Sequence, residues 1–312
     1  MANKKATRES YGEALALLAD ENKDVVVLDA DLSKSTKTEL FQKKAPDRFF
    51  DCGIAEGNMI GIAAGLAAAG KIPFASSFAM FAAGRAFEQI RNSVGYPHLN
   101  VKICATHAGI SVGEDGATHQ CCEDIALMRT IPGMVILNPC DHYEMQAAVR
   151  AAVEHKGPCY IRLGRLAVES INNNDDYKFE LGKGITLREG TDITVVATGL
   201  MVQEAVKAAD ALKEEGISVE VINIHTIKPL DEELVIASAK KTGRVITVEE
   251  HNIIGGLGEA VSTALSEHCP TPVTRIGVND VYGHSGPAVD LLKEFGLSAE
   301  HIAEVIREKL AK

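Results

Sequence analysis

Residues 51–65 read DCGIAEGNMIGIAAG, a stretch that indicates a strand passing into a helix of very small residues. Gly57, Gly61 and Gly65 recur every four residues and so share one helical face, which lets another backbone approach closely. Glu56 stands at the junction, where it either caps the helix through the helix dipole or stays protonated among apolar neighbours or binds a basic nitrogen. The residues alone favour capping, because structural carboxylates outnumber catalytic ones.

Apolar strands and helical patterns alternate on both sides of this stretch. In the first half, strands are expected at 24–28, 72–76, 101–105, 134–137 and 159–163, and helices at 8–22, 56–69, 79–93, 123–130 and 141–155. Apolar strands separated by helices are typical of a parallel sheet that is covered on both faces.

The polar segment 170–177, SINNNDDY, cannot build a core and is predicted to be a linker. After it the alternation restarts, with strands expected at 192–198, 218–224, 244–249 and 273–278. The sequence therefore predicts an α/β protein of two domains, each a mostly parallel sheet flanked by helices. We place the domains at residues 1–170 and 186–312, joined by a linker at 171–185.

Composition limits the classes of partner. The 312 residues are 46% hydrophobic and carry a net charge of -11, which argues against nucleic acid or an anionic membrane as the main partner. The first residues lack the basic-then-apolar form of a signal peptide, and the apolar run at 60–69 is too short to span a bilayer. Seven cysteines without a CxxC pair are best explained as reduced thiols. We therefore expect a cytoplasmic protein.

The loop at 106–124, THAGISVGEDGATHQCCED, is the richest in titratable groups. It follows a predicted strand, and ligands gather beyond the carboxyl ends of strands in open parallel sheets. Three interpretations are open: a metal site, a proton-transfer site that uses the histidines, and a structural loop with capping groups. The spacing of His107, Asp115 and His119 matches no standard metal-ligand pattern, so proton transfer is favoured over metal binding.

Aromatic and basic side chains also follow predicted strands. Phe78 and Phe81 have the spacing of core residues on a helix, but they come just after a strand end, where a flat ligand can stack. Arg8, Arg162 and Arg165 are candidate anion binders, because a guanidinium grips phosphate with two parallel bonds. Each arginine taken alone is more often a solvated surface charge.

The sequence GGLGEAV at 255–261 opens a predicted helix in the second half. Backbone N–H groups at such a helix start can hold an anion. The full dinucleotide fingerprint is missing, so a tight turn is favoured over a cofactor loop.

Taken together, these segments resemble the C-terminal part of a transketolase. ATRESYGEAL, LDADLSKST, DCGIAEGNMIGIAAG, SSFAMF, THAGISVGEDGATHQ, PGMVILNPCD and YIRLGR match that family in order and spacing through nearly the whole chain. The resemblance covers a pyrimidine-binding domain and a C-terminal domain. The diphosphate-binding domain, with its GDG…N metal motif, is missing. The chain therefore resembles one subunit of a split, two-subunit transketolase.

The resemblance implies roles around the cofactor thiamine diphosphate. Glu56 matches the catalytic glutamate that bonds the pyrimidine ring nitrogen. Phe78 and Phe81 match aromatic positions beside that ring, and Asp31 matches an acidic residue near the cofactor. A third aromatic position falls on Gly84, which weakens one wall of the ring pocket. The metal ion, Mg²⁺ or Ca²⁺, is expected on the partner subunit, and this chain supplies no metal ligand.

The resemblance also assigns substrate contacts. His119 matches a catalytic proton-transfer residue, and Asp115 matches a residue that meets the sugar hydroxyls. The group that holds the sugar phosphate is matched by Arg8, Ser35, His107 and Arg165, which leaves Arg162 as a structural charge. Holding the phosphate far from the reacting carbon fixes the register of the sugar.

The implied activity is transfer of a two-carbon ketol group from a ketose phosphate to an aldose phosphate, a step of the pentose phosphate pathway. We expect an N-terminal partner subunit, self-association and an α2β2 complex, because this chain alone holds only the pyrimidine end of the cofactor. Two alternatives stay open: a 1-deoxyxylulose-5-phosphate synthase-like subunit, which GATHQ and residues 124–137 also fit, and a non-catalytic assembly subunit. The intact Glu56, Asp115 and His119 argue against the second.

Overall fold

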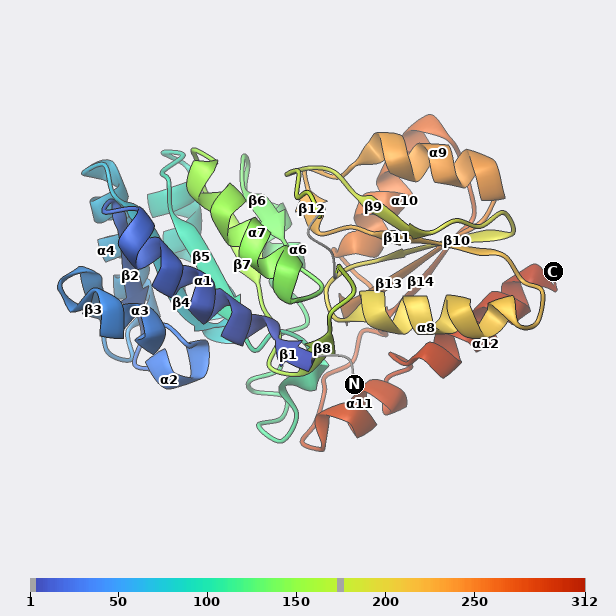
Figure 1. Ribbon diagram of the computed structural model, residues 1–312, viewed down its shortest axis with the longest axis horizontal. Coiled ribbons are helices and arrows are strands. Elements are labelled where there is room, and N and C mark those ends of the chain that lie inside the picture. Colours follow the sequence, from blue (N-terminus) through green and yellow to red (C-terminus); the bar gives the residue numbers. More distant parts are fainter. Residues whose placement is uncertain (1–3, 173–176, 312) are drawn as a thin grey trace.

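The first of two large sheets contains seven strands and lies in the left half of the computed structural model, which describes residues 4–172 and 177–311 (Figure 1). Its order is β12-β6-β7-β5-β4-β2-β3. The six strands from the first half of the chain run parallel, and β12 is antiparallel to β6. Their bounds are β2 (Val25–Asp29), β3 (Phe49–Asp51), β4 (Ile72–Phe78), β5 (Lys102–Thr106), β6 (Val135–Leu137), β7 (Cys159–Arg162) and β12 (Thr226–Lys228).

Helices cover this sheet because its strands are apolar on both faces. All five residues of β2 and all five of β5 are buried. One apolar cluster contains residues of α1 and α7, and another contains residues of α4 and α6. The helices of this half are α1 (Thr7–Glu21), α2 (Ser33–Thr36), α3 (Glu39–Lys44), α4 (Glu56–Ala68), α5 (Phe87–Gln89), α6 (Asp124–Arg129) and α7 (His142–Glu154).

The second sheet has five strands in the order β14-β13-β10-β11-β9. It is parallel except for the edge strand β9, which pairs antiparallel with β11. The strands are β9 (Ile185–Arg188), β10 (Ile193–Ala197), β11 (Val219–Asn223), β13 (Val245–Asn252) and β14 (Val273–Val278). The helices are α8 (Met201–Lys213), α9 (Glu232–Thr242), α10 (Leu257–His268), α11 (Ala288–Glu294) and α12 (Ala299–Leu310).

The predicted fold class is confirmed: two mostly parallel sheets are each flanked by helices. The proposed division at 171–185 stays a prediction, because residues 173–176 lie outside the described residues. Two small features were not predicted. Strand β12 comes from the second half of the chain but extends the first sheet, and β1 (Lys4–Ala6) pairs antiparallel with β8 (Ala167–Glu169). Strands β1, β8 and β12 are each three residues long, which is too short for an alternation of apolar and polar residues to be recognised in the sequence.

The helix expected at 79–93 is wound differently. It forms two π-helical segments, η2 (Met80–Arg85) and η3 (Ile90–Gly95), around the short α5. Such wide turns are rare and often lie at functional sites. The glycine face of α4 was expected to lie close to another backbone, but no backbone in the described part of the chain approaches it. A Cβ at Gly61 or Gly65 would meet no atom within 4 Å, and one at Gly57 would meet the side chain of Gln89.

None of the helices formed by residues 4–172 and 177–311 combines the length and apolar character required to cross a membrane.

Candidate active site

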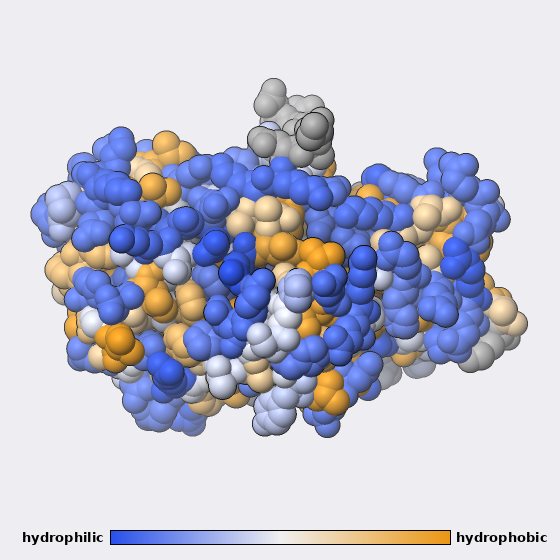
Figure 2. Space-filling view, turned by 90° about the horizontal axis from the view of Figure 1, so that it is seen from below, coloured by the Kyte–Doolittle hydropathy of each residue, from blue (hydrophilic) through white to orange (hydrophobic). Residues whose placement is uncertain are grey.

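The carboxyl ends of four neighbouring strands bring the predicted site residues to the lower side of the first sheet in Figure 1. Asp31 lies in the loop after β2, Ser35 lies in α2, which follows that loop, and Glu56 follows β3. Phe78 ends β4, and His107 follows β5. Figure 2 looks onto this side of the molecule, where hydrophobic side chains near the middle interrupt a mostly hydrophilic surface. Residues that are far apart in sequence therefore share one region.

The loop after β2 is shaped by a buried carboxylate. Asp29 ends the strand, and its Oδ1 accepts the backbone N–H of Leu32 at 2.6 Å, while its Oδ2 accepts the Thr36 hydroxyl at 2.7 Å. Burial raises the pKa of Asp29, although these donors oppose that rise. The turn that follows holds Asp31 at a φ of 62° and leaves its side chain exposed.

Glu56 is the first residue of α4, and its side chain is only 6% exposed. Arg85 Nη1 donates to Glu56 Oε1 at 3.1 Å. The same guanidinium lies over the Phe81 ring, with Cζ 4.0 Å from the ring centroid. The carboxylate therefore faces a cation above an aromatic ring rather than apolar neighbours alone. Arg85 was not singled out from the sequence; its only signal is a cation four residues after Phe81 on a helical pattern.

Four rings form a packed group beside Glu56. Phe78 and Phe81 stack with centroids 5.6 Å apart and planes at 17°. His107 stacks on Phe78 at 3.8 Å, and His119 meets Phe81 edge-on at 5.2 Å. The predicted gap at Gly84 is filled by another side chain, because a Cβ there would overlap Met80 Cε. The group offers a flat aromatic surface next to an acid.

A cationic region borders the rings on the side of His107. Arg8 Nη1 donates to the carbonyl of Ser35 at 3.0 Å and lies 3.2 Å from His107 Nε2. Burial, with the charges of Arg8 and Arg165 as further causes, lowers the pKa of His107 to about 3. His107 is thus neutral, with Nε2 accepting from Arg8 and Nδ1 donating to Thr106 Oγ1 at 2.9 Å, a tautomer assigned from these partners.

Two arginines, Arg8 and Arg165, carry the positive charge of this region. Burial lowers the pKa of Arg8, and the nearby charge of Arg165 adds to that effect. Arg165 donates to the carbonyl of Val112 and to Glu114 Oε2 at 3.0 Å, in an exposed ion pair. Two guanidiniums, of which only Arg165 pairs with an exposed carboxylate, form a surface that favours an anion.

The remaining predicted residues lie around this centre. His119 is half-buried, and its Nδ1 lies 2.9 Å from Thr118 Oγ1. Asp115 is exposed on the loop between His107 and His119. Arg162 is 4% exposed and pairs with Asp124 at 2.8 Å, so its charge is held inside the protein. Among the described residues, no cluster of three or more His, Cys, Asp or Glu side chains could hold a metal ion.

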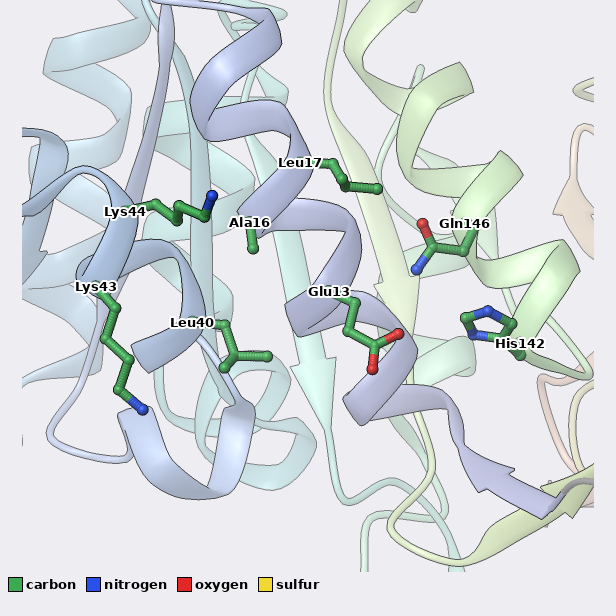
Figure 3. A pocket seen from close by; sticks show the side chains of 8 residues that line it. All are labelled: Glu13, Ala16, Leu17, Leu40, Lys43, Lys44, His142 and Gln146. Carbon is green, nitrogen blue, oxygen red and sulfur yellow. The ribbon is translucent and has the colours of Figure 1, made fainter.

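A separate groove lies on another surface, between α1, α3 and α7 (Figure 3). Leu17 and Leu40 form its apolar floor, and Lys43, Lys44 and His142 stand at its rim. The groove contains none of the predicted site residues.

Comparisons with known proteins identify the family of the chain. The transketolase pyrimidine-binding domain family matches residues 3–170, and the transketolase C-terminal domain family matches residues 182–302. The chain belongs to the transketolase family, whose members use thiamine diphosphate.

Several relatives match the chain over nearly its full length. A transketolase C-terminal section from Methanocaldococcus jannaschii is 54% identical over 99% of this chain and 97% of its own length. A 6-deoxy-6-sulfo-D-fructose transketolase subunit from a Clostridium species is 46% identical over 96% of this chain and 93% of its own length. A solved structure described as a split gene transketolase, inactive beta4 tetramer, superposes with a TM-score of 0.91 at 53% identity, covering 98% of each chain.

Proposed function

We propose that this chain is the C-terminal subunit of a split transketolase, which transfers a two-carbon ketol group from a ketose phosphate to an aldose phosphate. The observation that carries the proposal is the placement of Glu56. A nearly buried carboxylate at a helix start lies beside stacked phenylalanines, and a cationic region follows on the far side of the rings. An acid, a flat surface and an anion site in one row suit a flat heterocycle and a phosphorylated sugar.

The residues fit the pyrimidine end of thiamine diphosphate. When bound, this cofactor supplies a carbon nucleophile that carries the two-carbon unit. Glu56 holds a proton between its carboxylate and a ring nitrogen, and the Phe78–Phe81 pair supports the ring face. Arg85 bonds Glu56 and lies over the Phe81 ring, so its guanidinium would have to move aside for these two residues to hold the pyrimidine ring. Asp31 lies on the loop after β2, the strand between β3 and β4.

The other side chains orient the sugar. Arg8, Arg165, neutral His107 and Ser35 hold the terminal phosphate. His119 stands at the edge of Phe81, where it moves a proton at a sugar hydroxyl, and Asp115 accepts a hydrogen bond from a second hydroxyl. Anchoring the phosphate sets which carbon meets the cofactor, so binding energy is used for orientation.

We infer an N-terminal partner subunit that binds the diphosphate and its Mg²⁺ or Ca²⁺, in an α2β2 complex. The match to a split gene transketolase over almost the whole chain supports this inference. The inactive tetramer named for that relative supports self-association of this chain without its partner. The seven cysteines are all free thiols, which supports a cytoplasmic location.

The test combines the purified chain with an N-terminal transketolase subunit that carries GDG…N. Xylulose 5-phosphate and an aldose phosphate are supplied with thiamine diphosphate and Mg²⁺, and the new ketose phosphate is measured. We expect turnover from the mixture and none from either chain alone. Turnover by this chain alone would contradict the split arrangement, and a complex with the mass of a 1:1 pair would contradict α2β2.

A second candidate differs only in the donor. The sulfo-fructose transketolase relative favours a sulfonated ketose, because sulfonate and phosphate are both oxyanions that the Arg8–Arg165 region can hold. Parallel assays with a ketose phosphate, a sulfonated ketose and pyruvate separate the candidates. Preference for pyruvate would favour the 1-deoxyxylulose-5-phosphate synthase-like alternative.

A further inference from the structure

We propose that Glu250, in the second domain, is a positioning residue for the active-site loop of the first domain. The inference rests on the proposed function only in the kinetic half of its test. Glu250 lies in β13 and is 4% exposed. Its Oε1 accepts the backbone N–H of Ser111 at 2.6 Å. Ser111 lies between His107 and Asp115, on the loop that also carries His119.

The backbone of the loop leaves space for the Glu250 carboxylate at Gly109. Gly109 has a φ of 84°, and a Cβ at that position would overlap the Glu250 carboxylate. His107, two residues earlier, has a φ of 57°, which is uncommon for a residue with a side chain. A charge-assisted bond to a backbone N–H is stronger than a neutral one. The Glu250–Ser111 bond therefore holds a backbone path that the loop sequence does not favour by itself.

Glu250 is itself fixed from the first domain. Arg162 Nη2 donates to the Glu250 carbonyl at 2.8 Å, while Arg162 Nε donates to Asp124 at 2.8 Å. Asp124 begins α6, directly after the loop. The backbone of Glu250, whose side chain holds Ser111, is thus tied through Arg162 to the residue at the end of the loop.

Two further contacts from the second domain hold the middle of the loop. Gln120 Nε2 donates to the carbonyl of His284 at 3.0 Å and to that of Ile110 at 3.2 Å. Ser285 Oγ donates to the Glu114 carbonyl at 2.5 Å. In Figure 1, α11 lies beside this loop, and it packs on the Ile110–Val112 turn, η4. The position of Asp115 and His119 therefore depends on the second domain of the same chain.

The neighbouring residue provides a matched control. Glu249 lies on the same strand and is equally buried, at 1% exposure. Its carboxylate also accepts backbone N–H groups, those of Leu257 at 2.7 Å and Gly258 at 2.8 Å. These groups begin α10, and the turn before it accepts hydrogen bonds from Arg129 of α6 rather than from residues of the loop. Glu249→Ala removes the same kind of bond without touching residues 106–124.

The first test is amide hydrogen exchange on the chain without its partner, so it does not depend on activity. Glu250→Ala should accelerate exchange across residues 109–120 by about tenfold, because the loss of one charged hydrogen bond is of that order. Glu250→Gln keeps an acceptor at Ser111 and should retain most of the protection. Glu249→Ala should accelerate exchange at the start of α10 instead. Equal loop exchange in Glu250→Ala and Glu249→Ala would overturn the proposal, and so would unchanged exchange in Glu250→Ala.

The second test measures steady-state kinetics of the same variants with the partner subunit. Glu250→Ala should raise KM for the ketose phosphate by about tenfold, with a smaller fall in kcat, because misplaced sugar contacts weaken binding more than chemistry. Glu250→Gln should lie close to the wild type, and Glu249→Ala should keep the wild-type KM. Wild-type KM in Glu250→Ala would overturn the proposal. If the wild-type mixture shows no turnover at all, the proposed function fails, and the exchange experiment still decides the role of Glu250.

Discussion

The two domains share an architecture but differ in the carboxylates that follow their strands, apart from Asp29 of the first domain, which is buried and bonded to backbone like those of the second. In the first domain, Glu56 faces a cation and an aromatic ring, and Asp31 and Asp115 are exposed. In the second domain, Glu249 and Glu250 are buried and accept backbone N–H groups. The first set can exchange its partner for a ligand, whereas the second set is already satisfied by the protein. The two sheets thus both place acidic side chains near the carboxyl ends of their strands. The groups that each acid contacts decide whether it serves ligand binding or structure.

The largest expected effect tests the first half of that comparison. Glu56→Gln keeps size and hydrogen bonding but removes the proton that a ring nitrogen would share. We expect turnover of the two-subunit complex to fall by about 10²–10⁴-fold, the range for loss of a general acid–base group. The measurement is kcat with saturating thiamine diphosphate.

Its control is assembly, measured by the mass of the complex, which should be unchanged because the bulk of α4 is untouched. Retention of most activity by Glu56→Gln would show that this carboxylate resembles those of the second domain in being structural.

The next effect concerns the ion pair at the junction of the two domains. Asp124 is fully buried and accepts from both Tyr160 and Arg162 at 2.8 Å. Asp124→Ala leaves the Arg162 charge buried without its partner, which costs about 3–5 kcal/mol of unfolding free energy. Chemical denaturation measures the loss. The exposed Glu21–Arg150 pair is the matched control, and Glu21→Ala should change stability very little.

The buried histidines give a pH-dependent test of the same contrast. His107 of the first domain has its pKa lowered from 6.5 to about 3, mainly by burial. In the unfolded chain His107 binds a proton near pH 6.5, whereas in the native state it binds that proton only near pH 3. Stability therefore falls as the pH drops through this window, by about 1.4 kcal/mol per pH unit when the difference is one proton.

His107→Asn should flatten the curve of unfolding free energy against pH between about 6.5 and 3, relative to the wild type. His225 of the second domain is the comparison, because burial lowers its pKa to about 4. His225→Asn should flatten the same region while leaving sugar-phosphate binding unchanged. A His107→Asn curve parallel to that of the wild type would mean that His107 accepts a proton in the folded protein.

The sequence predicted the sheets well because buried parallel strands are mostly apolar, as in VVVL of β2 and ICA of β5. It also predicted which strand ends carry Glu56, Phe78 and His107. It could not predict Arg85 on Glu56 or Glu250 on Ser111, since these contacts join residues 29 and 139 positions apart. Such pairings depend on the folded arrangement and leave no local pattern.

The helix start at GGLGEAV illustrates the same limit. The motif suggests either an anion site or a tight turn, and the structure combines the two. The backbone N–H groups of Leu257 and Gly258 do bind a carboxylate, but it belongs to Glu249 of the same chain. Sequence identified the donors correctly and could not identify the acceptor.

The smallest expected effect compares a glycine from each domain. Gly61 lies inside α4 with open space around its missing Cβ, whereas a Cβ at Gly258 in α10 would meet Thr247 Oγ1 at 2.8 Å and Arg275 Cγ at 2.9 Å. Gly61→Ala should stabilise the isolated chain by up to about 1 kcal/mol, since alanine is the better helix former. Gly258→Ala should destabilise it. Thermal unfolding of the two variants measures both signs.

If Gly61 lowers the stability of the isolated chain, its role is expected in contacts with another chain. A destabilising glycine on an exposed helix face suits a surface that another backbone approaches closely, as the spacing of Gly57, Gly61 and Gly65 predicts. A methyl group at Gly61 should therefore weaken assembly while it strengthens the monomer, and sedimentation at graded concentration separates the two effects. If Gly61→Ala stabilises the chain and leaves every assembly intact, the α4 face is not a contact surface. The glycine face would then have no more role in assembly than the buried glycines of the second domain.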